Sequence, residues 1–240
     1  AASIEEAMLD VSEAPRQTAA QGRIGVPNVR PVEPVGPGLH RFPAAPGRDA
    51  LLLVPPNAPA AGAPLFVSLH GAGGNATAGL YPLEPLAPAA GLAVLAPAAL
   101  GRTWDLLLGE LGPDVTTIRR ALDAAFHAIA VDQARLALGG FSDGASYALS
   151  LGLANGDHFR RIVAFSPGFF APPLRIGKPR IFISHGVRDR VLPIDRCSRR
   201  IAPQLRAEGY EVEYVEFDGG HEVPTDIARR ALAWLLAASD

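Results

Sequence analysis

One pentapeptide constrains this chain more than any other feature: residues 140–144 read GFSDG, a G-x-S-x-G pattern. An apolar run at residues 136–138 precedes it, and a longer apolar stretch at 145–151 follows and reads as the start of a helix. A serine between a buried strand and a helix occupies a sharp, strained turn, where side chains at Gly140 or Gly144 would collide with the neighbouring strand and helix. The context favours a nucleophile elbow over an ordinary glycine turn with a surface serine.

Composition indicates a globular protein with a full apolar core. Of the 240 residues, 48% are hydrophobic and 19% are charged, as is typical of a folded domain of this size. The formal net charge is −2, and the one group of four nearby arginines has helical spacing, so nucleic acid is not an expected partner. No apolar run approaches the roughly 18 residues that read as a membrane span. Cys197 is the only cysteine, which excludes an intramolecular disulfide and a thiolate metal cage.

The first 35 residues differ from the rest because repeated prolines prevent regular structure in most of them. Residues 3–9 could form a short capped helix. We expect residues 1–35 to be a Pro-rich arm over the surface and residues 36–240 to be a single catalytic domain. The lone cysteine suits a cytoplasmic protein, but the chain begins at Ala1, so export with a leader removed stays open. The sequence does not indicate an oligomeric state.

Strands and helices alternate along the rest of the chain. Runs that are apolar throughout, at residues 65–69 and 93–96, are typical of parallel strands covered on both faces. An apolar stripe predicts a helix over 115–129 with Asp114 as its N-cap. The other expected strands are 39–42, 50–54, 136–138, 161–165, 179–184 and 211–217, and the other expected helices follow the pentapeptide and cover 194–208 and 224–238. The order predicts an α/β fold: a mostly parallel, doubly wound sheet of about eight strands with helices on both faces.

Candidate bases are histidines that follow strands, because the carboxyl ends of parallel strands meet at one edge of the sheet. His221 follows the last predicted strand, directly after two glycines that let the loop bring an imidazole toward Ser142. His70 and His185 also follow strands, but each precedes a glycine, where backbone shape rather than a base is expected. We predict His221 as the general base, the alternative being a histidine in a surface loop.

Three aspartates compete as the acid that orients this base. Asp189 follows the strand before the one that leads to His221, which gives the chain order serine, aspartate, histidine that accompanies this kind of elbow. Asp195 lies past a proline at a helix start, where N-capping explains it. Asp218 is so close to His221 in sequence that only a cramped local turn would join them. We predict Asp189 as the acid.

A glycine-rich turn at residues 70–74, HGAGG, directly follows a predicted strand. Such a turn leaves backbone N–H groups unpaired, and we predict that the amides of Ala72 and Asp143 bind the oxyanion of an acyl-transfer reaction. The Asp143 side chain is expected to face outward. A phosphate cradle is the alternative for such a turn, but the chain contains neither G-x-x-x-x-G-K-[ST] nor G-x-G-x-x-G.

These motifs together resemble the α/β-hydrolase family, and more narrowly its phospholipase/carboxylesterase branch, which includes acyl-protein thioesterases. The resemblance covers about residues 38–238. It implies the α/β-hydrolase fold, a triad of Ser142, Asp189 and His221, an acyl-enzyme intermediate, and neither a metal nor an organic cofactor. Thioesterase members usually carry glutamine directly after the nucleophile, whereas this chain has Asp143, which puts acyl-protein substrates in doubt.

The connection at residues 165–179 is too short for a cap domain. Phe169 could form an apolar rim or pack over the sheet edge, and Trp104 could supply the opposite wall. Gly71, Gly73 and Val191 are also expected to contact the substrate. An open apolar site predicts a small-molecule carboxylic ester of short to medium acyl chain, with thioesters or lysophospholipids as further substrates. The alternatives are a catalytically silent binding protein of this fold, and a peptidase or polyester depolymerase with the same triad.

Overall fold

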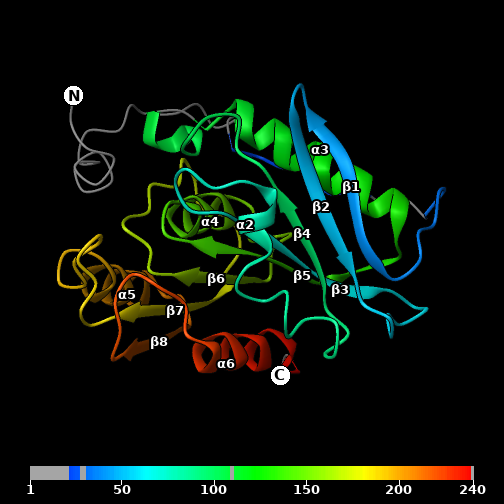
Figure 1. Ribbon diagram of the computed structural model, residues 1–240. Coiled ribbons are helices and arrows are strands. Elements are labelled where there is room, and N and C mark those ends of the chain that lie inside the picture. Colours follow the sequence, from blue (N-terminus) through cyan, green and yellow to red (C-terminus); the bar gives the residue numbers. More distant parts are fainter. Residues whose placement is uncertain (1–21, 28–30, 109–110, 239–240) are drawn as a thin grey trace.

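The computed structural model of the chain describes residues 22–27, 31–108 and 111–238. A central eight-stranded sheet carries helices on both faces (Figure 1). The strands are β1 (Gly38–Ala45), β2 (Arg48–Val54), β3 (Ala63–Leu69), β4 (Ala93–Pro97), β5 (Val131–Phe141), β6 (Arg161–Phe165), β7 (Arg180–Gly186) and β8 (Val212–Phe217). The helices are α2 (Ala76–Leu80), α3 (Pro113–Ala128), α4 (Asp143–Ala154), α5 (Ser198–Ala207) and α6 (Thr225–Leu236), with a 3-10 helix at Asp105–Leu108.

The strand order is β1-β2-β4-β3-β5-β6-β7-β8. The strands from β4 to β8 pair in parallel, and β1 and β2 form an antiparallel edge beside β4. The predicted α/β-hydrolase architecture is therefore confirmed. The connection between β6 and β7 has no helix or strand of its own, so the described part of the chain contains no cap domain.

Both faces of the sheet are buried, which explains why its central strands are apolar throughout. In β3, Leu65 and Val67 pack with α3 and part of α4 on one face. Phe66, between them in sequence, points to the other face and packs with α2 and α6. Further along the first face, α4 and α5 cover β6 and β7. Successive side chains of a strand point to opposite faces, so each strand contributes to two cores.

Two details differ from the sequence-based expectations. Asp114 is not the N-cap of α3; that position is Gly112, and the Asp114 carboxylate instead accepts hydrogen bonds from the N–H groups of Leu100 (2.8 Å) and Asp105 (2.9 Å). The short helix α2 and the 3-10 helix were not predicted, because five and four residues are too few to show a helical period.

The described residues of the N-terminal region lie against the domain. The Ile24 side chain is 1% exposed and belongs to the core beside α3. The Asn155 side chain, directly after α4, accepts from the Ile24 N–H and donates to the Gly22 carbonyl. The region is therefore more than a surface arm, because it supplies a core side chain. The helix expected over residues 3–9 lies outside the described residues. None of the helices in the described part of the chain has the length and hydropathy to cross a bilayer.

Candidate active site

Ser142 lies at the sharp turn between β5 and α4, with φ 58° and ψ −119°. A side chain at Gly140 would place its Cβ 2.5 Å from the Leu69 carbonyl oxygen, and one at Gly144 would collide with the carbonyl oxygens of Leu69 and His70. The turn is therefore strained at the serine, and glycine is required on both sides of it. The predicted strand–turn–helix context is confirmed.

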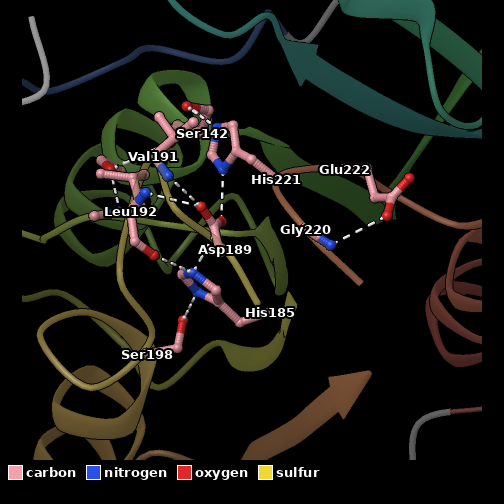
Figure 2. A network of polar contacts seen from close by, with 11 residues as sticks. Ser142, His185, Asp189, Val191, Leu192, Ser198, Gly220, His221 and Glu222 are labelled. Carbon is pink, nitrogen blue, oxygen red and sulfur yellow. Dashed lines mark hydrogen bonds and ion pairs between the residues drawn. The ribbon is translucent and has the colours of Figure 1, made fainter. Parts of the chain in front are cut away.

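The structure brings Ser142, His221 and Asp189 into one chain of hydrogen bonds (Figure 2). His221 Nδ1 lies 2.6 Å from Asp189 Oδ2, and His221 Nε2 lies 2.8 Å from Ser142 Oγ. An ionised carboxylate only accepts, so Nδ1–H donates to Asp189 and leaves Nε2 to accept from the serine hydroxyl. The imidazole also packs against the ring of Phe141, with 4.7 Å between centroids. This arrangement can remove a proton from Ser142.

Asp189 is held from several sides at the carboxyl end of β7. Its Oδ1 accepts from the N–H groups of Val191 (2.9 Å) and Leu192 (2.8 Å), and its Oδ2 contacts His185 Nε2 (3.2 Å) as well as His221. Burial opposes ionisation of the carboxyl, but the hydrogen bonds from the two histidines and from Leu192 outweigh it, and they hold the pKa of Asp189 well below its usual value. The Asp189 carboxyl stays charged and fixed in place.

His185 supports Asp189, a role that the sequence interpretation missed. Its Nε2 faces two acceptors, the Leu192 carbonyl oxygen (2.8 Å) and Asp189 Oδ2 (3.2 Å), so this nitrogen carries a proton. Its Nδ1 lies 2.7 Å from the Ser198 hydroxyl, which donates to it when the ring is neutral. The four-residue spacing between His185 and Asp189 across a tight turn was the available signal. Backbone shape alone does not explain this histidine.

The competing aspartates point elsewhere. Asp195 pairs with Arg199 (2.8 Å), and Asp218 pairs with Arg188 on the surface. Neither hydrogen-bonds to His221. Asp195 is not the cap of α5 either, since that helix begins at Ser198 with Cys197 in the capping position.

The turn at residues 70–74 lies against the elbow: a Cβ on Gly71 would be 3.4 Å from the Cβ of Ser142. Hydrogen bonds fix the turn at two further points, from the Gly73 N–H to the Arg102 carbonyl (2.5 Å) and from the Gly74 N–H to the Gly71 carbonyl (3.0 Å). The structure records no acceptor among the described residues for the N–H of Ala72. That amide is available to a ligand.

Two expectations about the surroundings of the serine are wrong. The Asp143 side chain does not face outward; it is 1% exposed, and its Oδ2 accepts from the Trp104 N–H (2.9 Å). The Trp104 side chain is fully buried between His70 and Tyr147, so it offers no surface to a substrate. Charged residues and aromatic residues in loops are expected at the surface. Here the buried Asp143 carboxyl and the buried Trp104 N–H satisfy each other.

The remaining predicted contact residues differ in exposure. Phe169 and Val191 are half-buried, and Phe169 packs against the core beside α3 and α4. Gly73 is exposed and has φ +75°, which a glycine adopts without strain. Among the described residues, no group of three or more His, Cys, Asp or Glu side chains could hold a metal ion.

Comparison with known proteins decides the family. The sequence profile of the phospholipase/carboxylesterase family matches residues 114–235, more than half of the 240 residues. The chain belongs to the phospholipase/carboxylesterase family. It is thereby an enzyme of the serine hydrolase type that acts on carboxylic esters, as predicted. No curated protein sequence matches this esterase.

Solved structures share the fold of this esterase at low sequence identity. An S-formylglutathione hydrolase from Staphylococcus aureus has a TM-score of 0.67 at 16% identity, covering 86% of this chain and 100% of that chain. A phospholipase/carboxylesterase from Dyadobacter fermentans has a TM-score of 0.61 at 21% identity, covering 78% and 96%. A carboxylesterase from Bacillus cereus has a TM-score of 0.61 at 18% identity, covering 78% and 93%. At these identities the likeness establishes the fold alone.

Proposed function

We propose that this esterase cleaves carboxylic esters through a Ser142–His221–Asp189 triad and an acyl-enzyme intermediate. One observation carries the proposal: the unbroken line of hydrogen bonds, 2.6 Å and 2.8 Å long, that joins the aspartate, the imidazole and the serine. Each of the three side chains follows a different strand, β5, β7 or β8, and they meet at one edge of the sheet. Such convergence has the geometry that serine nucleophilic catalysis requires.

The chemistry follows from the positions of the protons. His221 Nε2 takes the proton of the Ser142 hydroxyl while Oγ attacks the acyl carbon, and Asp189 stabilises the imidazolium that forms. The amides of Ala72 and Asp143 donate to the oxyanion. His221 then returns the proton to the leaving alkoxide, which departs as an alcohol. Water attacks the acyl-enzyme with His221 again as base, and the carboxylic acid and free serine are regenerated.

The proposed substrates are small esters with short to medium acyl chains. The β6–β7 connection places no cap domain over Ser142. The connection is bound to α4, because the Ser146 and Ser150 hydroxyls accept from the N–H groups of Gly168 (2.9 Å) and Ala171 (2.9 Å). Phe169 in this connection, with Gly71, Gly73 and Val191, is proposed to contact the substrate. Because one fold neighbour is an S-formylglutathione hydrolase, thioesters belong in the test panel beside esters, lysophospholipids and peptides.

The test is the Ser142→Ala variant assayed with p-nitrophenyl acetate. We expect kcat to fall by several orders of magnitude, on the order of 10⁴-fold or more, with an unchanged far-UV circular dichroism spectrum. Ser166→Ala is a matched control: Ser166 also follows a strand, has positive φ (50°) and is buried, but its hydroxyl has no hydrogen-bond partner among the described residues. We expect Ser166→Ala to keep kcat within a few-fold of the parent. A Ser142→Ala variant as fast as the parent would disprove the proposal.

A further inference from the structure

The loop that follows β4 contacts both segments that carry the proposed oxyanion amides. The Trp104 N–H donates to Asp143 Oδ2 (2.9 Å), which reaches the elbow. The Trp104 indole Nε1–H donates to the His70 carbonyl oxygen (2.8 Å), which reaches the start of the turn at 70–74. The Arg102 carbonyl accepts from the Gly73 N–H (2.5 Å) in the same turn. One residue, Trp104, therefore links the elbow to the turn through two separate N–H groups.

These links are buried and have little freedom. Trp104 is 0% exposed and both Asp143 and His70 are 1% exposed. The indole lies between two rings, with centroid distances of 5.0 Å to His70 and 5.2 Å to Tyr147. Water cannot replace a lost hydrogen bond at such a place, so removal of one partner leaves the other unsatisfied or forces the chain to move.

The two oxyanion amides belong to different segments, which the parallel β3–β5 pairing aligns only as far as Leu69 and Gly140. Ala72 follows β3 and Asp143 follows β5, so no covalent geometry fixes the distance between their N–H groups. An oxyanion hole works only when both donors lie at hydrogen-bond distance from the point where the negative charge develops. A shift of one donor by about 1 Å can cost a large share of the rate.

We propose that Asp143 and Trp104 are positioning residues of the oxyanion hole: the Asp143 carboxyl, bound to the Trp104 N–H, and the Trp104 indole, bound to the His70 carbonyl, together fix the amide of Asp143 relative to that of Ala72. This inference rests on the proposed function of Ser142. It assigns a role to the Asp143 side chain, beyond its backbone N–H, and to a tryptophan that touches no substrate.

The charge on the Asp143 carboxyl should affect the oxyanion, because the carboxyl belongs to the same residue as one of the two proposed oxyanion donors. It faces the carboxylates of Asp105 and Asp114. The Tyr147 hydroxyl donates to Asp105 (2.8 Å) and not to Asp143. His70 is the ring on the other side of Trp104; its Nε2 accepts from the Ala99 N–H (3.0 Å), and burial lowers its pKa, so it supplies no positive charge.

Protonated Asp143 keeps a carbonyl oxygen for the Trp104 N–H and places no charge beside the oxyanion. Ionised Asp143 adds a negative charge there, which opposes the developing oxyanion. Burial, with the charges of Asp114 and Asp105, raises its pKa to about 7 against the opposing Trp104 N–H. The ratio of kcat in Asp143→Asn to kcat in the parent should therefore rise as pH increases through neutrality.

The experiment compares three variants with the parent by kcat and KM for p-nitrophenyl acetate. Asp143→Ala removes the acceptor, and we expect kcat to fall by roughly 10- to 100-fold with KM within about twofold, since a misplaced donor weakens the transition state and not substrate binding. Trp104→Phe keeps a ring but removes the indole N–H, and we expect a fall of roughly tenfold. Asp143→Asn keeps an acceptor for the Trp104 N–H and should recover most of the kcat lost in Asp143→Ala.

A second readout separates positioning from general structural damage. A trifluoromethyl ketone forms a tetrahedral adduct with the serine and places an oxyanion in the hole, so its affinity should fall in proportion to kcat in each variant. If Asp143→Ala does not fold, Trp104→Phe provides the test, because it removes only the indole N–H that binds the His70 carbonyl. Trp104→Phe, or a folded Asp143→Ala, with parental kcat and inhibitor affinity overturns the inference. An active Ser142→Ala variant instead overturns the proposed function.

Discussion

Asp143 and Asp189 are both buried near the carboxyl edge of the same sheet, directly after Ser142 and just beyond β7, yet their surroundings differ. Asp189 accepts hydrogen bonds from two backbone N–H groups and two imidazoles. Asp143 accepts from one backbone N–H and faces two further carboxylates. The pKa of Asp189 is accordingly lowered and that of Asp143 raised to about 7. Burial opposes ionisation of both, so the number and charge of the partners decide the direction.

The difference in charge suits the two tasks of the proposed mechanism, which are support of the His221 base and stabilisation of the oxyanion. Next to His221, a permanent negative charge stabilises the imidazolium. Next to the oxyanion amides, a carboxyl that gives up its proton only near neutrality keeps added negative charge away from the place where negative charge develops. The comparison teaches that a buried aspartate near a nucleophile is not by that fact the triad acid. The hydrogen-bond donors around each carboxyl decide its charge, and the charge decides which proposed role it fits.

Replacing Asp189 with asparagine should have the largest effect on this comparison. The amide oxygen can still accept from the Val191 and Leu192 N–H groups, but the NH₂ group then faces His221 Nδ1 and donates to it. Nε2 would carry the proton and could not accept one from Ser142. We expect Asp189→Asn to lower kcat for p-nitrophenyl acetate by about 10³- to 10⁴-fold, the scale of the corresponding change in a serine protease triad.

Asp218→Asn is the matched control for this variant. Asp218 precedes His221 by three residues, but its carboxylate pairs with Arg188 at the surface, and both side chains are more than half exposed. We expect kcat within about twofold of the parent, since an exposed ion pair contributes little. A loss in Asp218→Asn as large as that in Asp189→Asn would contradict the assignment of the acid.

Replacing His185, which contacts Asp189, should lower kcat less than replacing Asp189 itself. His185→Phe keeps the shape of the ring but removes the donor to Asp189 and to the Leu192 carbonyl. We expect kcat to fall roughly tenfold, because Asp189 remains but is less firmly placed. KM should stay within about twofold, since His185 is buried behind Asp189 and does not face the substrate.

A fall in kcat with an unchanged far-UV circular dichroism spectrum distinguishes positioning from simple destabilisation, which lowers the folded fraction. His185→Gln offers a side-chain N–H near the position of Nε2 and should restore part of the lost activity. Equal activities in the parent and His185→Phe would show that the backbone donors alone hold Asp189.

The sequence predicted those parts of the site that depend on local chain geometry. Gly140 and Gly144 flank a serine with positive φ, and the sequence alone shows why no side chain fits there. Asp189 and His221 were predicted because a parallel sheet collects strand ends at one edge, so the order of strands along the chain limits which residues can meet. Helix and strand periods sufficed for these predictions.

The parts that were wrong depend on contacts between distant segments. Trp104 and Asp143 are 39 residues apart, and neither looks buried in sequence, because a charged residue after the nucleophile and an aromatic residue in a loop are ordinarily placed at the surface. The Trp104 backbone N–H pairs with the Asp143 carboxyl and its indole N–H with the His70 carbonyl, so the buried polar groups have partners. Asp114 was misread for a similar reason: its carboxylate binds the N–H groups of a separate loop.

The two aspartates should also differ in how the stability of the fold responds to pH, with opposite signs. The folded-state pKa of Asp143, about 7, exceeds its ordinary value of 3.8, so the folded state binds the proton more tightly and the stability of the parent falls as pH rises through this window. Relative to Asp143→Asn, the free energy of unfolding of the parent should decrease between about pH 4 and 7, by up to about 1.4 kcal/mol per pH unit.

Asp189 has a lowered pKa, so its contribution to the free energy of unfolding is present above its ordinary pKa and is lost as pH falls. Urea unfolding of the parent and Asp143→Asn between about pH 4 and 7, and of the parent and Asp189→Asn below about pH 4, measures the two differences; slopes of the same sign would show that the two carboxyls do not differ as the structure indicates.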